Sequence, residues 1–417
     1  MSRSIFRLAL HWQILAALIL GAGAGLLIPD VVTSVDFMGD LFLKGLRMVI
    51  VPLIMTSIIC GVAGLGGGDG VGRLGGKTLI YYTMSSLLAI VTGLVLVNLT
   101  QPGVGVDLGL ADQPDRLASS MDRFGDSPWS ALVRLLLDLV PSNPIAAMAE
   151  GNMLQIIVFA LLFGTFITRL PEAQREPLEA FFSSSFAVMM KVTHFILAFA
   201  PLGIFALVGR TVARTGLDVF AGLGLYALTV FLGLLIHAGV TLPLLLRSVG
   251  QLHPILHAKA MSPALLTAFS TSSSSATLPL TLDSLENRAG VSNRVTSFVA
   301  PLGATVNMDG TALYECVAAL FIAQAYGVEL TILQQGLVVV TALLASIGAA
   351  GIPMAGLVMI SVILTAVGLP LEGVGLILAV DRVLDMCRTT VNVWSDSCGA
   401  AVIARSEGEE GLVSLKS

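Results

Sequence analysis

The chain has 417 residues, of which 55% are hydrophobic and only 12% are charged, and its mean hydropathy is +0.91. Soluble proteins carry roughly twice that charged fraction, so the composition excludes an ordinary soluble domain and indicates a membrane protein. The net charge of −5 argues against a nucleic-acid partner. The four cysteines form no CxxC pair, which argues against a disulfide framework and a zinc site.

The first apolar segment lies near residues 8–28 and follows Arg3 and Arg7. A secretory signal peptide begins in the same way, but its apolar core is shorter. Because more apolar segments follow, we interpret this one as the first membrane-spanning helix. The further candidate spans, each about the 20 residues that a bilayer requires, lie near residues 40–63, 78–98, 146–168, 178–209 and 217–246.

The loop Gly64–Thr78 is rich in glycine and resembles two enzyme motifs. A phosphate-binding loop would need glycine at Val71 and a preceding strand, and neither is present. An intramembrane protease that used Asp69 would need a second aspartate in a preceding span, which is absent. Both enzyme interpretations fail, so we expect a mobile cytoplasmic loop here.

Two segments after residue 250 are typical of broken hairpins rather than simple spans. The first covers about 254–288 with a serine cluster at its middle, and the second covers about 331–368 with Gly348–Pro353 at its middle. Each precedes a long span with polar residues, at about 294–325 and 372–405. A hairpin-then-helix unit that occurs twice is expected of an inverted repeat in a transporter.

The serine cluster Ser270–Ser275 would usually be a flexible linker. Here it stands between apolar segments, which favours a hairpin tip at membrane depth. Hydroxyls and free backbone amides at the ends of two half-helices suit a carboxylate ligand.

The sequence Asn307-Met-Asp-Gly-Thr311 interrupts another apolar span. It could be a tolerated kink, since Gly310 costs a helix only about 1 kcal/mol. The carbonyl of Asn307 and the carboxylate of Asp309 beside unwound backbone favour a site for a hard cation such as sodium.

Between residues 381 and 396, polar side chains share one face of an apolar helix. A helical wheel places all of them within an arc of roughly 100°. They are Asp381, Asp385, Arg388, Thr389, Asn392 and Asp396. A charged group at the centre of a bilayer costs about 2.5–3.5 kcal/mol, so this face is predicted to line a polar site.

Basic residues flank alternate ends of the predicted spans, at Arg73, Lys77, Arg169, Arg175, Arg247 and Lys259, and the loop 101–128 is acidic on balance. The positive-inside rule then places both termini in the cytoplasm. Arg210 and Arg214 fall on the outer side and contradict this assignment.

With the serine cluster, Asn307–Thr311, Gly348–Pro353 and Asp385–Asp396 in place, the chain resembles the dicarboxylate/amino acid:cation symporters. This family includes excitatory amino-acid transporters and archaeal aspartate transporters. The resemblance implies an all-α protein with eight transmembrane helices, two re-entrant hairpins, inverted repeats and an elevator mechanism. It also implies a homotrimer whose scaffold comprises residues 1–77 and 101–210, with residues 78–100 and 211–417 as the transport domain.

The resemblance further implies site residues. Arg388 would bind the substrate's side-chain carboxylate and Asp385 its amino group. The other substrate ligands would be Ser273, Ser274, Thr311, Thr389 and Asn392, with backbone from Ile352 to Gly356. One sodium site would use Gly303, Asn307, Asn392 and Asp396. A second would use Tyr82, Ser85, Ser86, Asn307 and Asp309. A third would use Thr305, Ser346, Ile347 and Ala349 beside Met308.

Four positions inform the subtype. Arg388 suits acidic substrates, and Glu315 stands where the animal members of the family have a glutamate that carries a proton. Ser272 and Met386 stand where other members have an auxiliary arginine, so we expect Asp385 to lack a second cation.

We therefore predict a sodium-coupled symporter for aspartate or glutamate in the plasma (inner) membrane, with proton co-transport through Glu315 as a hypothesis. Apart from transported sodium, and protons or potassium, it would need no cofactor. Its partners would be substrate, sodium, membrane lipid and further copies of itself. A C4-dicarboxylate symporter and, ranked lower, a neutral amino-acid exchanger are the alternatives.

Overall fold

Helices make up the regular structure of the part of the chain that the computed structural model describes. Those residues are 10–63, 69–106, 137, 140–215, 219–348 and 355–409, and no strand occurs among them. The all-α prediction is confirmed for these residues.

The helices of the first half are α1 (Leu10–Leu27), α2 (Pro29–Ser34), α3 (Phe37–Ala63), α4 (Asp69–Thr100), α7 (Pro144–Glu150), α8 (Met153–Ile167), α9 (Glu172–Ala198) and α10 (Ala200–Thr215). Those of the second half are α11 (Val219–Ile236), the π-helical turn η3 (His237–Thr241), α12 (Leu242–Ser248), α13 (Pro254–Thr271), α14 (Ser274–Asp283), η4 (Ser284–Arg288), α15 (Asn293–Val306), α16 (Asp309–Ala325), α17 (Ile332–Gly348), α18 (Ala355–Val367), η5 (Leu371–Gly373) and α19 (Val374–Ser406).

Several of these helices are long and apolar enough to cross a membrane. Within the described residues three single stretches qualify, Arg73–Thr100, Gly222–Ser248 and Asn293–Ala325. A fourth candidate is the pair Ala16–Leu27 and Pro29–Phe42, which bend by 119° where they meet. Other predicted spans are divided in the structure: 146–168 consists of α7 and α8, and 178–209 consists of α9 and α10.

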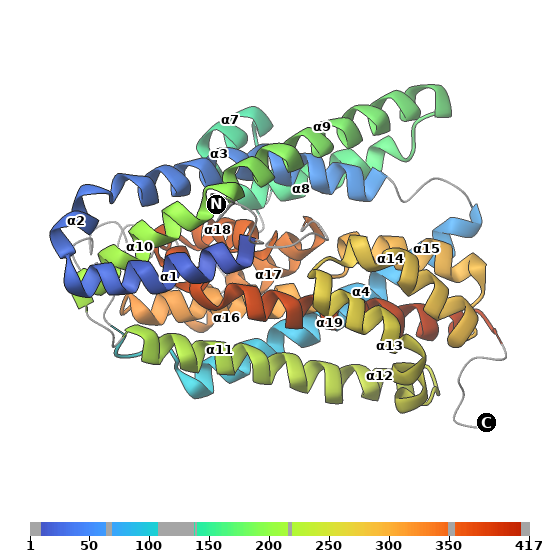
Figure 1. The fold of residues 1–417 in the computed structure, drawn as a ribbon. Coiled ribbons are helices and arrows are strands. Elements are labelled where there is room, and N and C mark those ends of the chain that lie inside the picture. The colour runs from blue at the N-terminus through green and yellow to red at the C-terminus, as the bar shows by residue number, and fades with distance from the viewer. Residues whose placement is uncertain are drawn as a thin grey trace, which may run out of the picture.

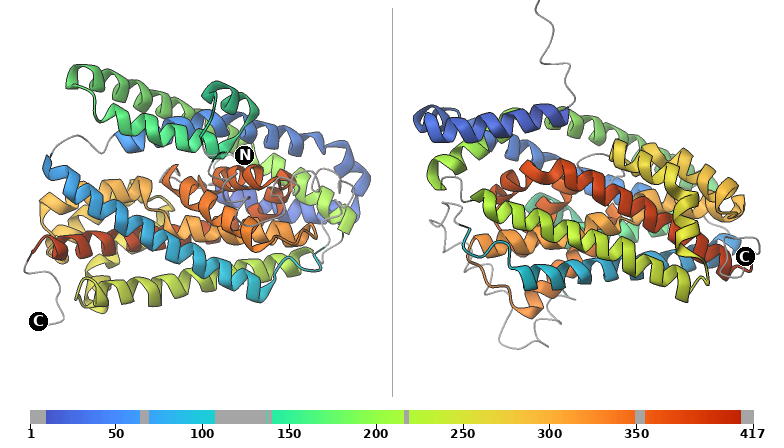
Figure 2. Two further views of the ribbon diagram at one scale, coloured as in Figure 1. Left: turned by 180° about the vertical axis from the view of Figure 1, so that it is seen from behind. Right: turned by 60° about the horizontal axis from the view of Figure 1, so that its bottom comes forward.

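The packing divides the helices into two groups. In the first, α1 lies along α10, and α3 contacts α8, α9 and α10. In the second, α16 packs against α4, α17 and α19, while α13 and α15 also pack against α19. Figure 1 shows α3, α8 and α9 on one side of the molecule and α11 on the other, with α16 and α19 between them and α4 running diagonally behind. The views in Figure 2 show that α4 and α11, which contact each other, run along the outside of the second group.

Two backbone breaks in the second group expose helix ends inside the bundle. Between α13 and α14, Ser272 adopts a left-handed conformation (φ 52°) that ends α13, and Ser273 caps α14 by accepting a hydrogen bond from the Ala276 amide at 3.1 Å. Between α15 and α16, Asn307 is extended (φ −105°, ψ 91°). Each break leaves helix-terminal N–H or C=O groups available to side chains or ligands.

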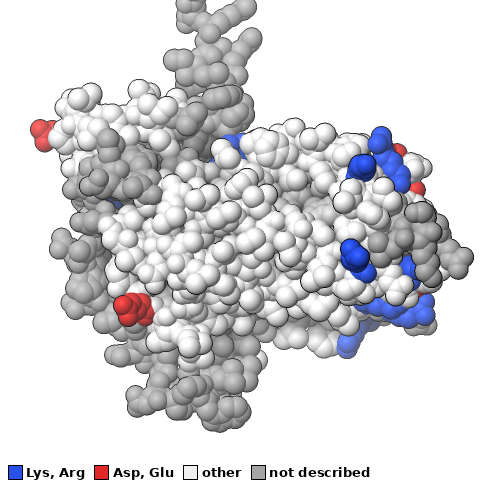
Figure 3. All heavy atoms as spheres, turned by 90° about the horizontal axis from the view of Figure 1, so that it is seen from below, with Lys and Arg blue, Asp and Glu red and all other residues white. Residues whose placement is uncertain are grey.

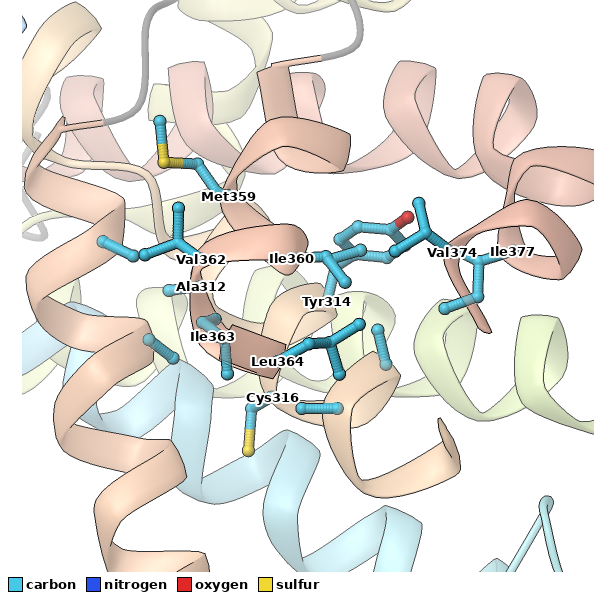
Figure 4. Close-up of a cluster of buried hydrophobic side chains, with 14 of the residues drawn as sticks. Ala312, Tyr314, Cys316, Met359, Ile360, Val362, Ile363, Leu364, Val374 and Ile377 are labelled. Atoms are coloured by element: carbon cyan, nitrogen blue, oxygen red, sulfur yellow. The ribbon is translucent and has the colours of Figure 1, made fainter. Parts of the chain in front are cut away.

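Apolar packing fixes the helices around these breaks. Figure 4 shows Ile360, Ile363 and Leu364 of α18 facing residues of α16, with Tyr314 of α16 near Val374 of α19. These side chains are buried in one hydrophobic cluster that joins α16, α18 and α19. The core therefore supports the helix α16 whose first turn begins at the second break.

Charge gathers at one end of the molecule. On the face drawn in Figure 3, most Lys and Arg lie at the end where α19 terminates, and the long flank is uncharged. At this end Glu407 accepts hydrogen bonds from Lys77 (2.6 Å), Arg73 (2.6 Å) and Arg294 (3.3 Å). An uncharged flank between charged ends is expected of a protein surrounded by hydrocarbon.

Candidate functional site

The polar face of α19 is buried. Exposure is between 1% and 5% for each of Asp381, Asp385, Arg388, Thr389, Asn392 and Asp396. The prediction of one inward-facing polar stripe, made from helical spacing, is confirmed.

Arg388 stands at the centre of this stripe. Its Nη1 donates to Oδ1 of Asp381 at 2.8 Å, and its Nε and Nη2 donate to Oδ1 of Asp385 at 3.0 and 2.8 Å. The guanidinium carbon lies 4.1 Å from the ring centroid of Tyr314, whose hydroxyl donates to Asp381 at 2.7 Å. These charge-assisted bonds hold a fully buried cation in one orientation. An incoming carboxylate could replace Asp385 on the same guanidinium edge.

Arg382 supplies a second cation to Asp385. Its Nη1 lies 3.7 Å from Oδ2 of Asp385, and its side chain is 25% exposed. The expectation that Asp385 lacks an auxiliary cation is therefore wrong. The spacing i to i+3 on one helix brings the two groups together. On a helical wheel Arg382 falls just beyond the edge of the polar arc, but a long side chain reaches across that boundary.

The start of α18 lies directly against Arg388. A Cβ added to Gly356 would stand 2.8 Å from the guanidinium carbon, so only a glycine leaves this space to the arginine. Gly356 is thus brought to the predicted substrate site. Ile352 and Ala349 lie outside the described residues.

Asn392 connects the stripe to the first turn of α16. Its Oδ1 accepts the Gly310 amide at 2.8 Å, and its Nδ2 donates to the Thr311 hydroxyl at 3.1 Å. The approach is close, since a Cβ on Gly310 would lie 2.5 Å from the Arg388 carbonyl oxygen. Asn392 and Thr311 therefore share one polar wall with Arg388.

The serine turn contributes a helix N-terminus. Ser272, Ser273 and Ser274 are buried, and α14, which starts at Ser274, packs against α19. The first amides of α14 carry the positive end of the helix dipole, which favours an anion. Ser273 and Ser274 thus lie on an element that borders the stripe.

One cluster of oxygens surrounds Asp309. Its Oδ1 accepts hydrogen bonds from Ser86 at 2.6 Å and Ser85 at 3.3 Å, and Ser85 also lies 3.3 Å from Oδ1 of Asn307. Tyr82 is buried on the same helix α4, and its hydroxyl donates to the Val299 carbonyl at 2.8 Å. The structure brings together four of the five residues predicted for the second sodium site, Ser85, Ser86, Asn307 and Asp309, whereas the Tyr82 hydroxyl bonds to Val299.

A second cluster surrounds Asp396. Its Oδ1 accepts from Nδ2 of Asn307 at 2.8 Å, and a Cβ on Gly303 would lie 2.5 Å from that oxygen and 2.6 Å from the Tyr82 hydroxyl. Asn307 thereby joins the two buried carboxylates. Among the described residues neither Asp309 nor Asp396 has an ion pair with Lys or Arg. Two buried carboxylates without such a partner require another positive charge, and a hard cation with oxygen ligands supplies one.

The third predicted cation set is only partly described. Met308 is buried at the α15–α16 break, and Ser346 is buried near the end of α17, which packs against α15. Ile347 lies beside Ser346, whereas the Thr305 side chain is exposed and bonds back to the Leu302 carbonyl at 3.0 Å. Of the predicted set, Thr305 lies on α15, Ser346 and Ile347 lie on α17, and Met308 lies at the break that follows α15.

Glu315 lies one turn beyond Thr311 on α16 and is fully buried. Neither of its carboxylate oxygens has a hydrogen-bond partner in the described part of the chain. A charged carboxylate in such a place is costly, so a protonated side chain suits this position.

Three functional neighbours escaped the sequence analysis. His237 approaches Oδ2 of Asp309 at 2.9 Å, and Ser395 donates to the same oxygen at 2.6 Å. Tyr314 orients both Asp381 and Arg388. Helical spacing of three residues from Thr311 and from Asn392 could have found Tyr314 and Ser395, but His237 is remote in sequence and only the fold brings it near.

Comparison with known proteins agrees with this geometry. Residues 10–406 match the model of the sodium:dicarboxylate symporter family. A proton/glutamate-aspartate symporter of Escherichia coli K12 is 38% identical, over 96% of this chain and 93% of its own. A proton/sodium-glutamate symport protein of Geobacillus stearothermophilus is 36% identical, over 97% and 96% of the two chains. Excitatory amino acid transporter 3 of Mus musculus is 36% identical, over 96% and 86%.

The match covers both the buried stripe and the oxygen clusters, and it identifies a transporter rather than an enzyme. The chain belongs to the sodium:dicarboxylate symporter family.

Proposed function

We propose that this protein is a sodium-coupled symporter that carries aspartate or glutamate across the plasma membrane. The observation that carries the proposal is the buried Arg388–Asp385 pair, which lies on the same helix face as Asp396. The names of the relatives, which specify glutamate and aspartate symport, support it.

The substrate would replace an internal ion pair. Arg388 and Asp385 neutralise each other in the structure, with Arg388 Nη2 2.8 Å from Asp385 Oδ1. An acidic amino acid brings a carboxylate for the arginine and an ammonium for the aspartate, so both buried charges stay paired after the exchange. Thr311, Thr389 and Asn392 would add hydrogen bonds. The α14 N-terminus at Ser273 and Ser274, and backbone from Ile352 to Gly356, would bind the second carboxylate.

Sodium ions would drive uptake. The substrate carries one net negative charge, and moving that charge inward against the membrane potential costs about 2.3 kcal/mol per 100 mV. Cations bound at Asp309, at Asp396 and beside Met308 would reverse the sign of the transported charge. They would also relieve the repulsion between two buried carboxylates that Asn307 joins.

The two packing groups support an elevator arrangement. The group α1–α3 with α7–α10 would be a trimeric scaffold, and α4 with α11–α19 would be the moving domain. Helices α13–α14 and α17–α18 would be re-entrant hairpins within eight spans, and the basic end near Glu407 would be cytoplasmic with both termini. Arg210, which contradicted this orientation, is paired with Asp36 at 3.0 Å and Asp40 at 3.3 Å, so its charge is balanced locally.

The experiment is uptake of labelled aspartate into proteoliposomes, with sodium, proton and potassium gradients imposed one at a time. The proposal expects uptake with an inward sodium gradient and its loss in Arg388→Ala, because this variant removes the buried guanidinium that would bind the side-chain carboxylate. Sodium-induced thermal stabilisation of Arg388→Ala serves as the control for folding. Undiminished uptake by that variant would reject the site.

Proton co-transport through Glu315 would be tested in the same assay. Glu315→Gln keeps the shape of the side chain and removes its proton exchange. Its uptake should lose the dependence on external pH that the wild type shows. Retention of the full dependence would eliminate Glu315 as the carrier.

A C4-dicarboxylate symporter is the alternative. Succinate would satisfy Arg388 but would bring no ammonium to Asp385. We therefore expect succinate to compete weakly with aspartate, and strong competition would favour the alternative.

A further inference from the structure

His237 contacts the carboxylate at the centre of the Asp309 cluster from a helix that supplies none of the predicted ligands. Its Nε2 lies 2.9 Å from Oδ2 of Asp309, and both side chains are fully buried. A carboxylate has only acceptor oxygens, so the ring nitrogen is the donor. The other ring nitrogen, Nδ1, has no hydrogen-bond partner among the described residues.

The local backbone presents this ring in an unusual way. His237 begins the π-helical turn η3, which interrupts an otherwise continuous helix from Val219 to Ser248. Such turns insert an extra residue and occur frequently at functional sites. The turn is held by α19, because Nε1 of Trp394 donates to the Ala238 carbonyl at 3.1 Å.

The hydrogen bonds to Asp309 divide its two oxygens. Oδ2 accepts hydrogen bonds from His237 and Ser395, while Oδ1 accepts them from Ser85 and Ser86, which belong to the predicted sodium ligands. Serine hydroxyls can rotate and present lone pairs to a cation, but an imidazole N–H cannot accept one. His237 therefore fixes the oxygen that faces away from the cation ligands.

We infer that His237 is a positioning residue that orients the Asp309 carboxylate so that its Oδ1 faces a bound sodium ion. This inference rests on the proposed sodium coupling and adds a residue to it. The histidine acts as an outer partner of the ligand, in the way that hydrogen-bonded neighbours orient the ligands of other metal sites.

Three variants at the position separate the role of Nε2 from simple packing. In His237→Gln the side-chain amide nitrogen lies near the position of Nε2. In His237→Asn the amide reaches only the position of Nδ1, and His237→Ala removes the ring. His237→Gln should stay close to the wild type. His237→Asn and His237→Ala should raise the sodium concentration for half-maximal effect about tenfold or more, as loss of such partners does at other metal sites.

His257 offers a matched control. It is also a buried histidine, at 2% exposure, but its ring lies against Trp394, with centroids 5.4 Å apart. His257→Gln alters a buried ring of the same type that reaches η3 only through Trp394, so it should shift the sodium dependence less than His237→Asn does.

The measurement is the unfolding temperature of the purified protein, without substrate, at increasing sodium concentrations. Choline chloride replaces sodium chloride so that the ionic strength stays constant. The second readout is aspartate uptake at saturating sodium, where His237→Asn should recover the wild-type KM. A structural defect would instead lower stability and uptake at every sodium concentration.

The outcomes are distinct. If the wild type shows no sodium response, the proposed sodium coupling fails and the inference fails with it. If the wild type responds but His237→Asn matches it, or His237→Gln is shifted as far as His237→Asn, the inference alone is overturned. Should His237→Ala not fold, the comparison of Gln with Asn still decides.

Discussion

At the scale of single residues, the site consists of charges that the protein pairs with each other. Arg388 contacts Asp381 and Asp385 at 2.8 Å, and both carboxylates are buried. Removing one partner of such a buried pair leaves an unpaired charge, which is more damaging than the pair is stabilising. A ligand that offers both charges can replace the pair without leaving either one alone.

Arg382 gives the first prediction at this scale. It lies 3.7 Å from Asp385 and is partly exposed, so its pair with Asp385 is worth at most about 1 kcal/mol. Arg382→Ala leaves Asp385 to Arg388 alone, and that tighter internal pair opposes an incoming carboxylate. We expect the KM for aspartate to rise by up to about fivefold at saturating sodium. The KM of Arg382→Lys should lie between those of Arg382→Ala and the wild type. An unchanged KM in Arg382→Ala would show that the Arg382–Asp385 pair has no part in substrate binding.

At the scale of helices, close approach between α16 and α19 decides the geometry of the site. A Cβ on Gly310 would lie 2.5 Å from the carbonyl oxygen and 2.9 Å from the Cα of Arg388. Both are backbone atoms and cannot move aside without shifting a helix. The first turn of α16 can therefore reach Asn392 only while residue 310 is glycine.

Gly310→Ala should destabilise the protein. Overpacking of this kind typically costs about 1–3 kcal/mol, so we expect a lower thermal unfolding temperature. Gly336→Ala is the control, because a Cβ at this position in α17 would meet no atom within 4 Å. Alanine should be neutral or slightly stabilising there. Equal behaviour of the two variants would contradict the close helix contact.

The end of α19 is tied to two other helices through one carboxylate. Glu407 binds Lys77 and Arg73 at the start of α4 and Arg294 at the start of α15. Hydrogen bonds from Lys77, and then the bonds and charge of Arg73, hold the pKa of the Glu407 carboxyl below its ordinary value of 4.5. A carboxylate with a lowered pKa in the folded state stabilises that state whenever it is ionised.

This sign gives a pH prediction. The stabilisation by Glu407 is fully present above pH 4.5 and is lost as the pH falls through the lowered pKa. Glu407→Gln should therefore unfold at a lower temperature than the wild type at pH 7, and the difference should shrink as the pH falls below 4.5. High salt should reduce it as well, because the Arg73 and Arg294 side chains are 71% and 63% exposed. A difference that stays constant with pH would contradict the role of the ionised carboxyl.

At the scale of the whole molecule, packing separates two groups of helices that contact each other at fewer places. Helix α3 meets α17 and α18 across the boundary, whereas α1 and α10 lie along each other within the first group. Relative motion of the two groups would change the contact of α3 with α17 and α18 and would leave the contact of α1 with α10 intact.

A disulfide test follows from this difference. A cross-link between α3 and α18 should abolish aspartate uptake and reduction should restore it, because the link prevents the groups from moving. A cross-link within the first group, between α1 and α10, should leave uptake unchanged, since these two helices lie along each other. It avoids Gly21, where a Cβ would lie 2.7 Å from the Phe205 carbonyl oxygen. Both proteins would be made in a background without the four native cysteines. Full uptake by the cross-linked α3–α18 protein would reject the motion.

The amino-acid sequence was sufficient to predict the helical class, the breaks and the polar face of α19. These depend on local properties: the length of apolar runs, backbone that cannot continue a helix at Asn307-Met308, and the spacing of Asp385, Arg388 and Asn392 along one helix. Resemblance then named the residues of the oxygen clusters, which the structure brings together from α4, α15, α16 and α19.

The partner of each buried charge, in contrast, could be found only from the way the helices pack. The tertiary structure placed His237 against Asp309 across 72 residues of sequence, and it brought Arg382 to Asp385 although the helical wheel put it outside the stripe. It also showed that Arg388 is paired with Asp381 and Asp385 of the same helix. Burial makes each of these charges require a partner, but which partner comes within about 3 Å depends on how distant helices pack, and a one-dimensional pattern does not contain that information.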